Sequence, residues 1–163
     1  MKRKISEAKM FAILTKLLSK EKLSELERKS IYKDTDGTYS LFGQYLIKPE
    51  GNIFIVSKNR THTELDFTEL KNAVTWATFD KINNINLARK VVQLDTQLNG
   101  ALQNVRVYER LCKNTKNLDT KSIYLCKLNE NRIKRNNILS ELELYVNRAK
   151  EWQYKQFELN SSK

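Results

Sequence analysis

Apolar residues recur at alternating steps of four and three through almost four heptads in the middle of the chain. This spacing predicts one amphipathic helix whose narrow apolar seam must pack against another helix. The heptad keeps its phase across Asn99-Gly100, which favours a helix that continues through this pair. The seam positions are Leu87, Val91, Leu94, Leu98, Ala101, Val105, Tyr108 and Cys112.

The expected partner is the last long segment, residues 120–157, which carries a second seam. Traced back toward the loop, this seam meets Arg135 and Asn131 before it reaches Leu128 and Tyr124, and residues 129–137 are polar almost all round. The pattern therefore predicts an antiparallel helical hairpin, a stalk over 85–158, with its loop at 113–119 and a weakly packed loop end. Asp119 or Thr120 is the expected helix cap. The second seam is Ile138, Leu142, Tyr145, Ala149 and Trp152.

The first half of the chain predicts a small head over residues 1–82. Residues 5–29 carry a broad apolar face, so we expect a helix packed on the domain, with a basic membrane-surface helix as the alternative. Strands are predicted at Tyr39–Ile47 and Ile53–Ser57, joined by 48–52. The first strand places Tyr39, Leu41, Tyr45 and Ile47 on one face, which is the expected inner face of the sheet. A lone hairpin is marginal in water, so it needs a helix, a third strand near 61–65, or a second subunit.

A helix over 66–82 is expected to connect the head to the stalk. Asp66 and Glu69 resemble a capping box at its start. Asp80 and Asn84 would interrupt the apolar line, which suggests a bend or break between residues 80 and 86 and leaves open whether 66–113 is one helix or two. The expected fold is thus mainly α, a single domain over 1–163 in which a long helical hairpin joins a head with a minor α+β part.

The net charge is distributed unevenly along the chain, and this bears on the expected binding partners. The net charge is +11, and residues 1–33 and 105–163 carry +6 each, whereas 34–104 carry −1. Such basic ends favour polyanion partners, although a Lys- and Asn-rich chain from an AT-rich genome would also look basic. The only cysteines, Cys112 and Cys126, flank the predicted loop, and two reduced thiols are favoured over a disulfide.

The sequence does not meet the requirements of a secretion signal, a transmembrane helix or a known catalytic motif. The apolar run 10–18 contains Lys16 and has no cleavage site, and no run reaches about 18 apolar residues, so we expect an intracellular protein with no membrane partner. Residues 34–38 resemble the start of a phosphatase of the haloacid-dehalogenase type, but the apolar strand before it and the later acidic pair are missing.

The same stretch also fails as an EF-hand, because its glycine and its final acid are misplaced. His62 is the only histidine, and the four glycines are isolated. We therefore expect no enzyme activity, no cofactor, no metal and no small-molecule substrate.

Two groups of residues stay as candidates for binding. Nine bases against three acids gather at the loop end of the stalk, where they would bind nucleic-acid phosphates or simply form a solvated surface. Four aromatic residues of the predicted β-hairpin could stack on nucleobases, but packing in the core or pairing with another subunit is the favoured use. The bases are Arg106, Arg110, Lys113, Lys116, Lys121, Lys127, Arg132, Lys134 and Arg135; the aromatic residues are Tyr39, Phe42, Tyr45 and Phe54.

Four stretches between residues 39 and 158 resemble small uncharacterised proteins of large tailed phages, especially phages of marine bacteria. They are Leu41–Ile47, Leu70–Trp76, Leu94-Asp95 and Ala149–Gln153. The resemblance implies a virion or host-cytoplasm location and transfers no functional residue. The leading hypothesis is a non-enzymatic structural or assembly protein that self-associates through the helical seam or the edge of the β-hairpin. A nucleic-acid-binding accessory protein is the alternative.

Overall fold

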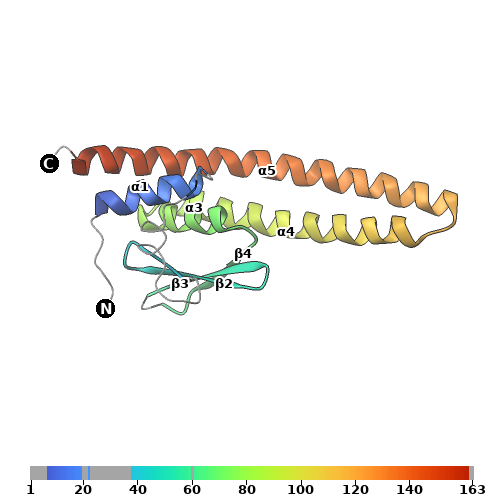
Figure 1. Cartoon of the computed structure of the whole chain (residues 1–163), viewed down its shortest axis with the longest axis horizontal. Coiled ribbons are helices and arrows are strands. Elements are labelled where there is room, and N and C mark those ends of the chain that lie inside the picture. Colours follow the sequence, from blue (N-terminus) through green and yellow to red (C-terminus); the bar gives the residue numbers. More distant parts are fainter. Residues whose placement is uncertain (1–6, 20–21, 23–37, 60, 162–163) are drawn as a thin grey trace.

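The computed structural model describes residues 7–19, 22, 38–59 and 61–161. They form a mainly helical fold with a small antiparallel sheet, which confirms the predicted fold class. Figure 1 shows α5 along the whole length, α1, α3 and α4 beside it, and the sheet on the side away from α5. The elements are α1 (Glu7–Leu18), β1 (Tyr39–Leu41), β2 (Tyr45–Glu50), β3 (Ile53–Lys58), β4 (Glu64–Phe67), α3 (Leu70–Lys81), α4 (Ile85–Asn114) and α5 (Leu118–Ser161).

The long hairpin of α4 and α5 confirms the prediction from the heptads. Most of the predicted α4 seam is buried, while Leu87 and Tyr108 are half-buried. On α5, the seam also includes Val146 and Gln153, both fully buried, and Trp152 lies at its margin. The helix continues through Gly100 as the unbroken phase predicted.

The turn of the hairpin is tighter than expected. The connection is only 115–117, and Asn117 Oδ1 accepts hydrogen bonds from the amides of Asp119 at 3.0 Å and Thr120 at 3.1 Å. The helix cap is therefore Asn117, and the prediction of Asp119 or Thr120 was wrong because it placed the start of the helix too late. An asparagine oxygen in this place satisfies amides that the first turn leaves unpaired.

The break between α3 and α4 is confirmed, but the predicted start of α3 is wrong. Asn83 turns the chain with φ 59°, and Asn84 Oδ1 accepts from the Leu87 amide at 3.3 Å to begin α4. Asp66 belongs to β4, so the capping box does not form; Glu69 is the N-cap and makes no side-chain hydrogen bond there. Pairing with β3 outcompetes the local helix signal at Asp66.

The sheet is a four-stranded antiparallel meander in the order β1-β2-β3-β4. The predicted single strand 39–47 is two strands, because Phe42 (φ 55°) and Gly43 (φ 70°) form a tight turn. β2 then extends to Glu50, into the turn predicted at 48–52, and Pro49 is tolerated because β1 pairs only as far as Ile47. β4 supplies the additional strand that was one of the three supports considered for the hairpin, at Glu64–Phe67, later than the predicted 61–65.

One core joins the sheet, α1, α3 and the head-side parts of α4 and α5. The inner face of the sheet buries the predicted residues of the first strand, and α1 buries Phe11, Ile13 and Leu14 against the other helices. This confirms packing of the first helix over residues 7–18; the rest of the predicted helix over 5–29 lies outside the described helix. Both cysteines are free thiols, Cys112 buried and Cys126 exposed.

Candidate interaction site

The nine predicted bases all lie in the distal arm, which we define as residues 105–137, the part of the hairpin farthest from the sheet (Figure 1). Seven of their side chains are exposed, and Arg132 and Arg135 are half-buried. Arg132 pairs with Glu109 at 3.3 Å and Lys127 with Glu130 at 3.6 Å. Two of the three acids are thereby used within the chain, and a large excess of positive charge stays exposed.

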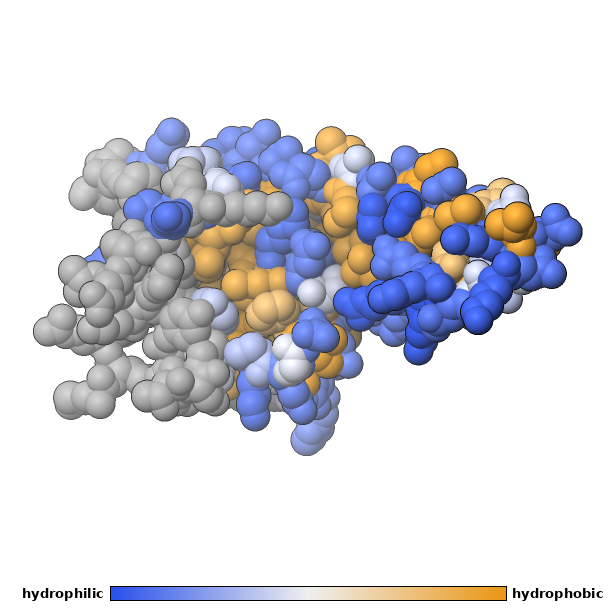
Figure 2. All heavy atoms as spheres, turned by 45° about the vertical axis from the view of Figure 1, so that its right-hand side comes forward, coloured by the Kyte–Doolittle hydropathy of each residue, from blue (hydrophilic) through white to orange (hydrophobic). Residues whose placement is uncertain are grey.

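The surface of the distal arm is better suited to contacts with nucleic-acid phosphates than to recognition of nucleobases. Figure 2 shows hydrophilic residues over much of this projecting end, with separate apolar residues between them. Its two half-buried tyrosines, Tyr108 and Tyr124, pack on each other with ring centroids 6.3 Å apart. They therefore belong to the seam. Contacts to phosphates alone would give binding that weakens with salt and ignores sequence.

Only a small core holds the distal arm together. Val105, Cys112 and Leu128 are its buried residues, and the two tyrosines pack against them. The arm is two helices thick, so each helix has one neighbour and must expose most of its surface. This matches the predicted weak packing of the loop end.

The four aromatic residues predicted in the β-hairpin do not form a flat exposed surface on which bases could stack. Tyr39 and Tyr45 are buried, and Phe42 and Phe54 are half-buried. The Phe42 ring lies 6.0 Å from that of Phe11 and 6.4 Å from that of Trp152, which brings α1, α5 and the β1–β2 turn together. Core packing, the favoured use, is what these contacts show for Phe42.

A polar cluster that sequence reasoning missed joins the sheet to α3. The Tyr45 hydroxyl donates to Asp80 Oδ2, and Lys58 Nζ lies 2.9 Å from the same oxygen. Burial, then the hydrogen bond and charge of Asp80, raise the pKa of Tyr45 above its ordinary value. The hydroxyl therefore stays protonated, and the cluster holds β2, β3 and α3 together.

A second unforeseen cluster surrounds Asp95, which is 3% exposed. Its carboxylate accepts from the Thr68 amide and hydroxyl, the latter at 2.9 Å, and from Asn72 Nδ2 at 2.9 Å. Burial raises the pKa of Asp95, and these hydrogen bonds partly offset the rise. The cluster joins α4 to the β4–α3 connection. The sequence signal was a charged residue beside the seam position Leu94.

A third buried polar group is Gln153, which links three helices. Its Nε2 donates to Thr78 Oγ1 at 3.1 Å, and its Oε1 accepts from Thr15 Oγ1 at 3.4 Å. These side chains come from α5, α3 and α1. Because each buried polar atom of the amide has a partner, the group fixes how the helices align.

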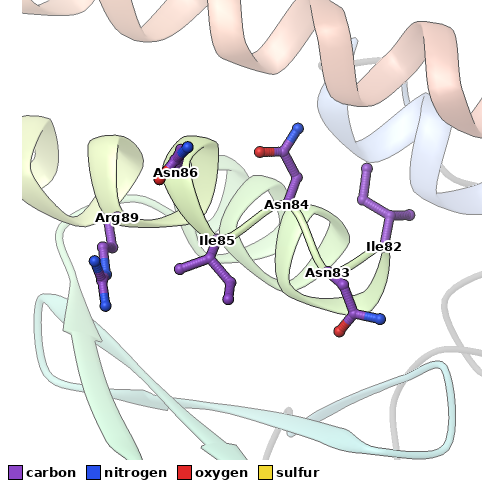
Figure 3. Close-up of a pocket in the computed structure, with 6 residues that line it drawn as sticks. All are labelled: Ile82, Asn83, Asn84, Ile85, Asn86 and Arg89. Atoms are coloured by element: carbon purple, nitrogen blue, oxygen red, sulfur yellow. The ribbon is translucent and has the colours of Figure 1, made fainter.

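A shallow hollow of about 620 Å³ lies at the α3–α4 corner. Figure 3 shows Asn83, Ile85 and Arg89 pointing to the sheet side, while Asn84 and Asn86 point the other way. Its lining offers amides, one guanidinium and apolar atoms but no carboxylate or thiol. Such a lining can hold a small polar ligand weakly and supplies no acid, base or nucleophile.

Other sequence motifs add no chemistry to the described part of the chain. His62 is exposed in the β3–β4 connection, and residues 34–37 of the phosphatase-like stretch lie outside the described residues. Among 7–19, 22, 38–59 and 61–161, no three His, Cys, Asp or Glu side chains gather as a metal site. No helix in these ranges is both long and apolar enough to span a bilayer.

The arrangement defines the chain as a helical-hairpin protein with an α+β head. Comparison with protein-family models, curated proteins and solved structures finds no match.

Proposed function

We propose that this protein is a non-enzymatic structural or assembly protein that associates with copies of itself through the helical hairpin. The observation that carries the proposal is the position of the exposed large apolar side chains. All nine that stand out among the described residues lie on α4 or α5, seven of them on α5. The described large apolar residues of the sheet, α1 and α3 are buried or half-buried. Exposed apolar residues that gather on one element are typical of interaction surfaces.

The seam between α4 and α5 is buried within the chain, so it serves the fold. Self-association therefore uses the outer surface of the hairpin or an edge of the sheet. Both edge strands are short, three residues in β1 and four in β4, which favours the helical hairpin. The resemblance to tailed-phage proteins supports a role in a virion or in its assembly in the host cytoplasm.

Light scattering coupled to size exclusion, from micromolar to near-millimolar protein, tests this proposal. We expect a defined oligomer whose mass stays constant at high salt, because apolar contacts do not weaken with screening. A monomer at every concentration would contradict the proposal.

A second candidate function, nucleic-acid binding, is supported by the charge of the distal arm. Nine bases against three acids within 33 residues, with two of the acids already in ion pairs, create a strongly positive end. Such an end would bind phosphates without reading sequence. In this function the head would act as a carrier for the arm.

Charge reversal distinguishes the second function from a solvated surface. The triple variant Arg132→Glu, Lys134→Glu and Arg135→Glu should weaken binding of a duplex DNA at least tenfold and flatten its salt dependence. The matched control reverses three bases outside the arm, Lys48, Arg89 and Lys150, with the same change in net charge. Equal losses in both triples would mean that only net charge matters.

A further inference from the structure

The outer surface of α5 carries an exposed stripe along its whole length. We call it the outer stripe: positions 118, 122, 125, 129, 133, 136, 140, 144, 147, 151, 154 and 158, all exposed. Eleven of the twelve lie two residues from a buried or half-buried position of α5, and two residues turn a helix by about 200°. The outer stripe therefore faces away from α4, which runs below α5 in Figure 1.

The composition of the outer stripe differs from that of a solvated face. Five of its twelve positions are large and apolar, with side chains 43–81% exposed. None is Lys or Arg, although α5 contains eight such residues. In a chain with 30 Lys and Arg among 163 residues, a solvated face would carry some of them. The five apolar residues are Leu118, Leu125, Ile133, Leu144 and Tyr154.

The spacing of the outer stripe indicates the shape of its partner. Its steps of four, three and four repeat every 11 residues for much of α5, a period of about 3.67 that keeps a stripe nearly parallel to the helix axis. From Leu118 to Glu158 the stripe spans about 60 Å at 1.5 Å per residue. A partner that covers all five apolar residues must itself be a long helix.

The charges of α5 favour a second copy in the antiparallel direction. Residues 118–137 contain five bases and two acids, whereas 138–161 contain three bases and four acids. An antiparallel pair brings the basic half of each helix to the acidic half of the other. A parallel pair would place the two basic halves together, at a cost in electrostatic energy.

We propose that the outer stripes of two copies pack on each other in antiparallel orientation about a two-fold axis near Ile138. The proposal deepens the function above, from which it takes self-association. About this axis, Ile133 of each copy lies level with Leu144 of the second copy. Tyr154 lies level with Ser122 of the second copy, as a knob between Leu118 and Leu125. All five exposed apolar residues are thus covered.

The same register also pairs polar residues, although it was chosen from the apolar residues alone. Asn129 comes level with Asn147 of the second copy, where two amides can exchange hydrogen bonds. On one flank, Glu130 comes level with Arg148 and Asp119 lies near Lys155. Each of these pairs occurs twice by symmetry. Charges of opposite sign along one flank specify this direction and register, as they do in coiled coils.

Substitution of Ile133 by lysine tests the outer stripe. Ile133→Lys places two like charges near the two-fold axis, and we expect it to raise the dimer dissociation constant at least tenfold. The matched control is Ile123→Lys, because both isoleucines lie on α5 and are 61% exposed, but Ile123 lies off the outer stripe. Circular dichroism should show the same melting for both variants under conditions where each is monomeric. Equal effects of the two substitutions on the dimer would overturn the proposal.

The native thiol Cys126, exposed beside the outer stripe, tests the direction independently. In the proposed register Glu151 of the second copy lies level with Leu125 and on the same side as Cys126. The Glu151→Cys variant should therefore form an intermolecular disulfide with Cys126 under mild oxidation. The control Glu158→Cys, on the same stripe but about 10 Å farther along, should not. A disulfide between two Cys126 residues of the native chain would overturn the proposal, since antiparallel packing keeps them about 36 Å apart.

The two experiments separate this interface from the function on which it rests. A native chain that is monomeric throughout the light-scattering series would contradict self-association itself. A native oligomer that Ile133→Lys leaves intact, with no intermolecular disulfide at Cys126 in the Glu151→Cys variant, would overturn only the interface. An oligomer weakened by Ile133→Lys and not by Ile123→Lys, together with that disulfide, would support both.

Discussion

The head and the distal arm use the same helices but bury them differently. At the head end, α4 and α5 are covered by α1, α3 and, beyond them, the sheet, and all of these share one core. In the distal arm the same two helices have only each other, and three buried residues form the core. The heptad pattern of α4 runs through both regions without change. The number of neighbours that a helix has, rather than its own pattern, sets how much apolar surface it buries.

This difference also separates what each region can do. Among the described residues, the buried polar side chains lie in the head or at the head end of the hairpin, where Asp95 on α4 and Gln153 on α5 tie elements together. The distal arm has a net charge of +6, from nine bases and three acids, and several exposed apolar residues, so it is suited to contacts with other molecules. We expect the head to provide the stability and the arm to provide the binding surface.

The largest effect is expected from a cavity in the core that the head shares with α4 and α5. Leu142 is 2% exposed in the shared core, and Leu142→Ala should lower the free energy of unfolding by about 3 kcal/mol. Urea denaturation, followed by far-UV circular dichroism, measures this change. A loss below about 1 kcal/mol would contradict the view that the head core dominates stability.

Loss of the Asp95 carboxylate should cost about 2 kcal/mol. Asp95→Ala leaves the Thr68 amide and hydroxyl and the Asn72 amide without this acceptor in a buried place. Asp95→Asn keeps an acceptor oxygen and should cost less. The same denaturation experiment compares the two variants, and equal costs would mean that the hydrogen bonds are unimportant.

The raised pKa of Asp95 also predicts that the free energy of unfolding depends on pH, and the two Asp95 variants test this. The folded carboxyl has a raised pKa, so between its ordinary value of 3.8 and the raised value the folded state binds more protons than the unfolded state. Its contribution to stability therefore falls as pH rises through this window. Asp95→Asn cannot titrate and should remove that part of the slope. An unchanged slope would show that Asp95 does not titrate there.

A smaller effect, about 1 kcal/mol, is expected from Tyr45→Phe. The ring keeps its edge contact with Trp76, at 5.8 Å between centroids, and only the hydrogen bond to Asp80 is lost. Asp80 still has Lys58 as a partner. Thermal melting followed by circular dichroism measures this change, and an unchanged melting temperature would mean that the hydrogen bond is unimportant.

The smallest effect on global stability is expected from Leu128→Ala in the distal arm. Although Leu128 is only 3% exposed, its small core can open without the head, so we expect a global loss below about 1 kcal/mol. Hydrogen exchange should instead become faster in residues 105–128 alone. Faster exchange across α3 as well would show that head and arm unfold as one unit.

Sequence reasoning predicted the hairpin, the break near Asn84 and the inner face of the sheet because each depends on local periodicity. It failed at Asp66 and at residues 39–47. In the first case pairing with β3 outcompeted a helix cap, and in the second two left-handed residues turned a strand that still alternated correctly. The Asp95 and Gln153 clusters could not be predicted, since their partners are at least 23 residues away in the chain.

The sequence by itself determined the helices, their antiparallel pairing and the charge of the distal arm, because spacing and composition are properties of the chain. Only the tertiary structure decided which helix surfaces are covered. α1 and α3 cover α4 and α5 at one end, and nothing in the described chain covers the outer stripe. A seam and an exposed stripe can have similar apolar residues, and only the position of the neighbouring helices tells them apart.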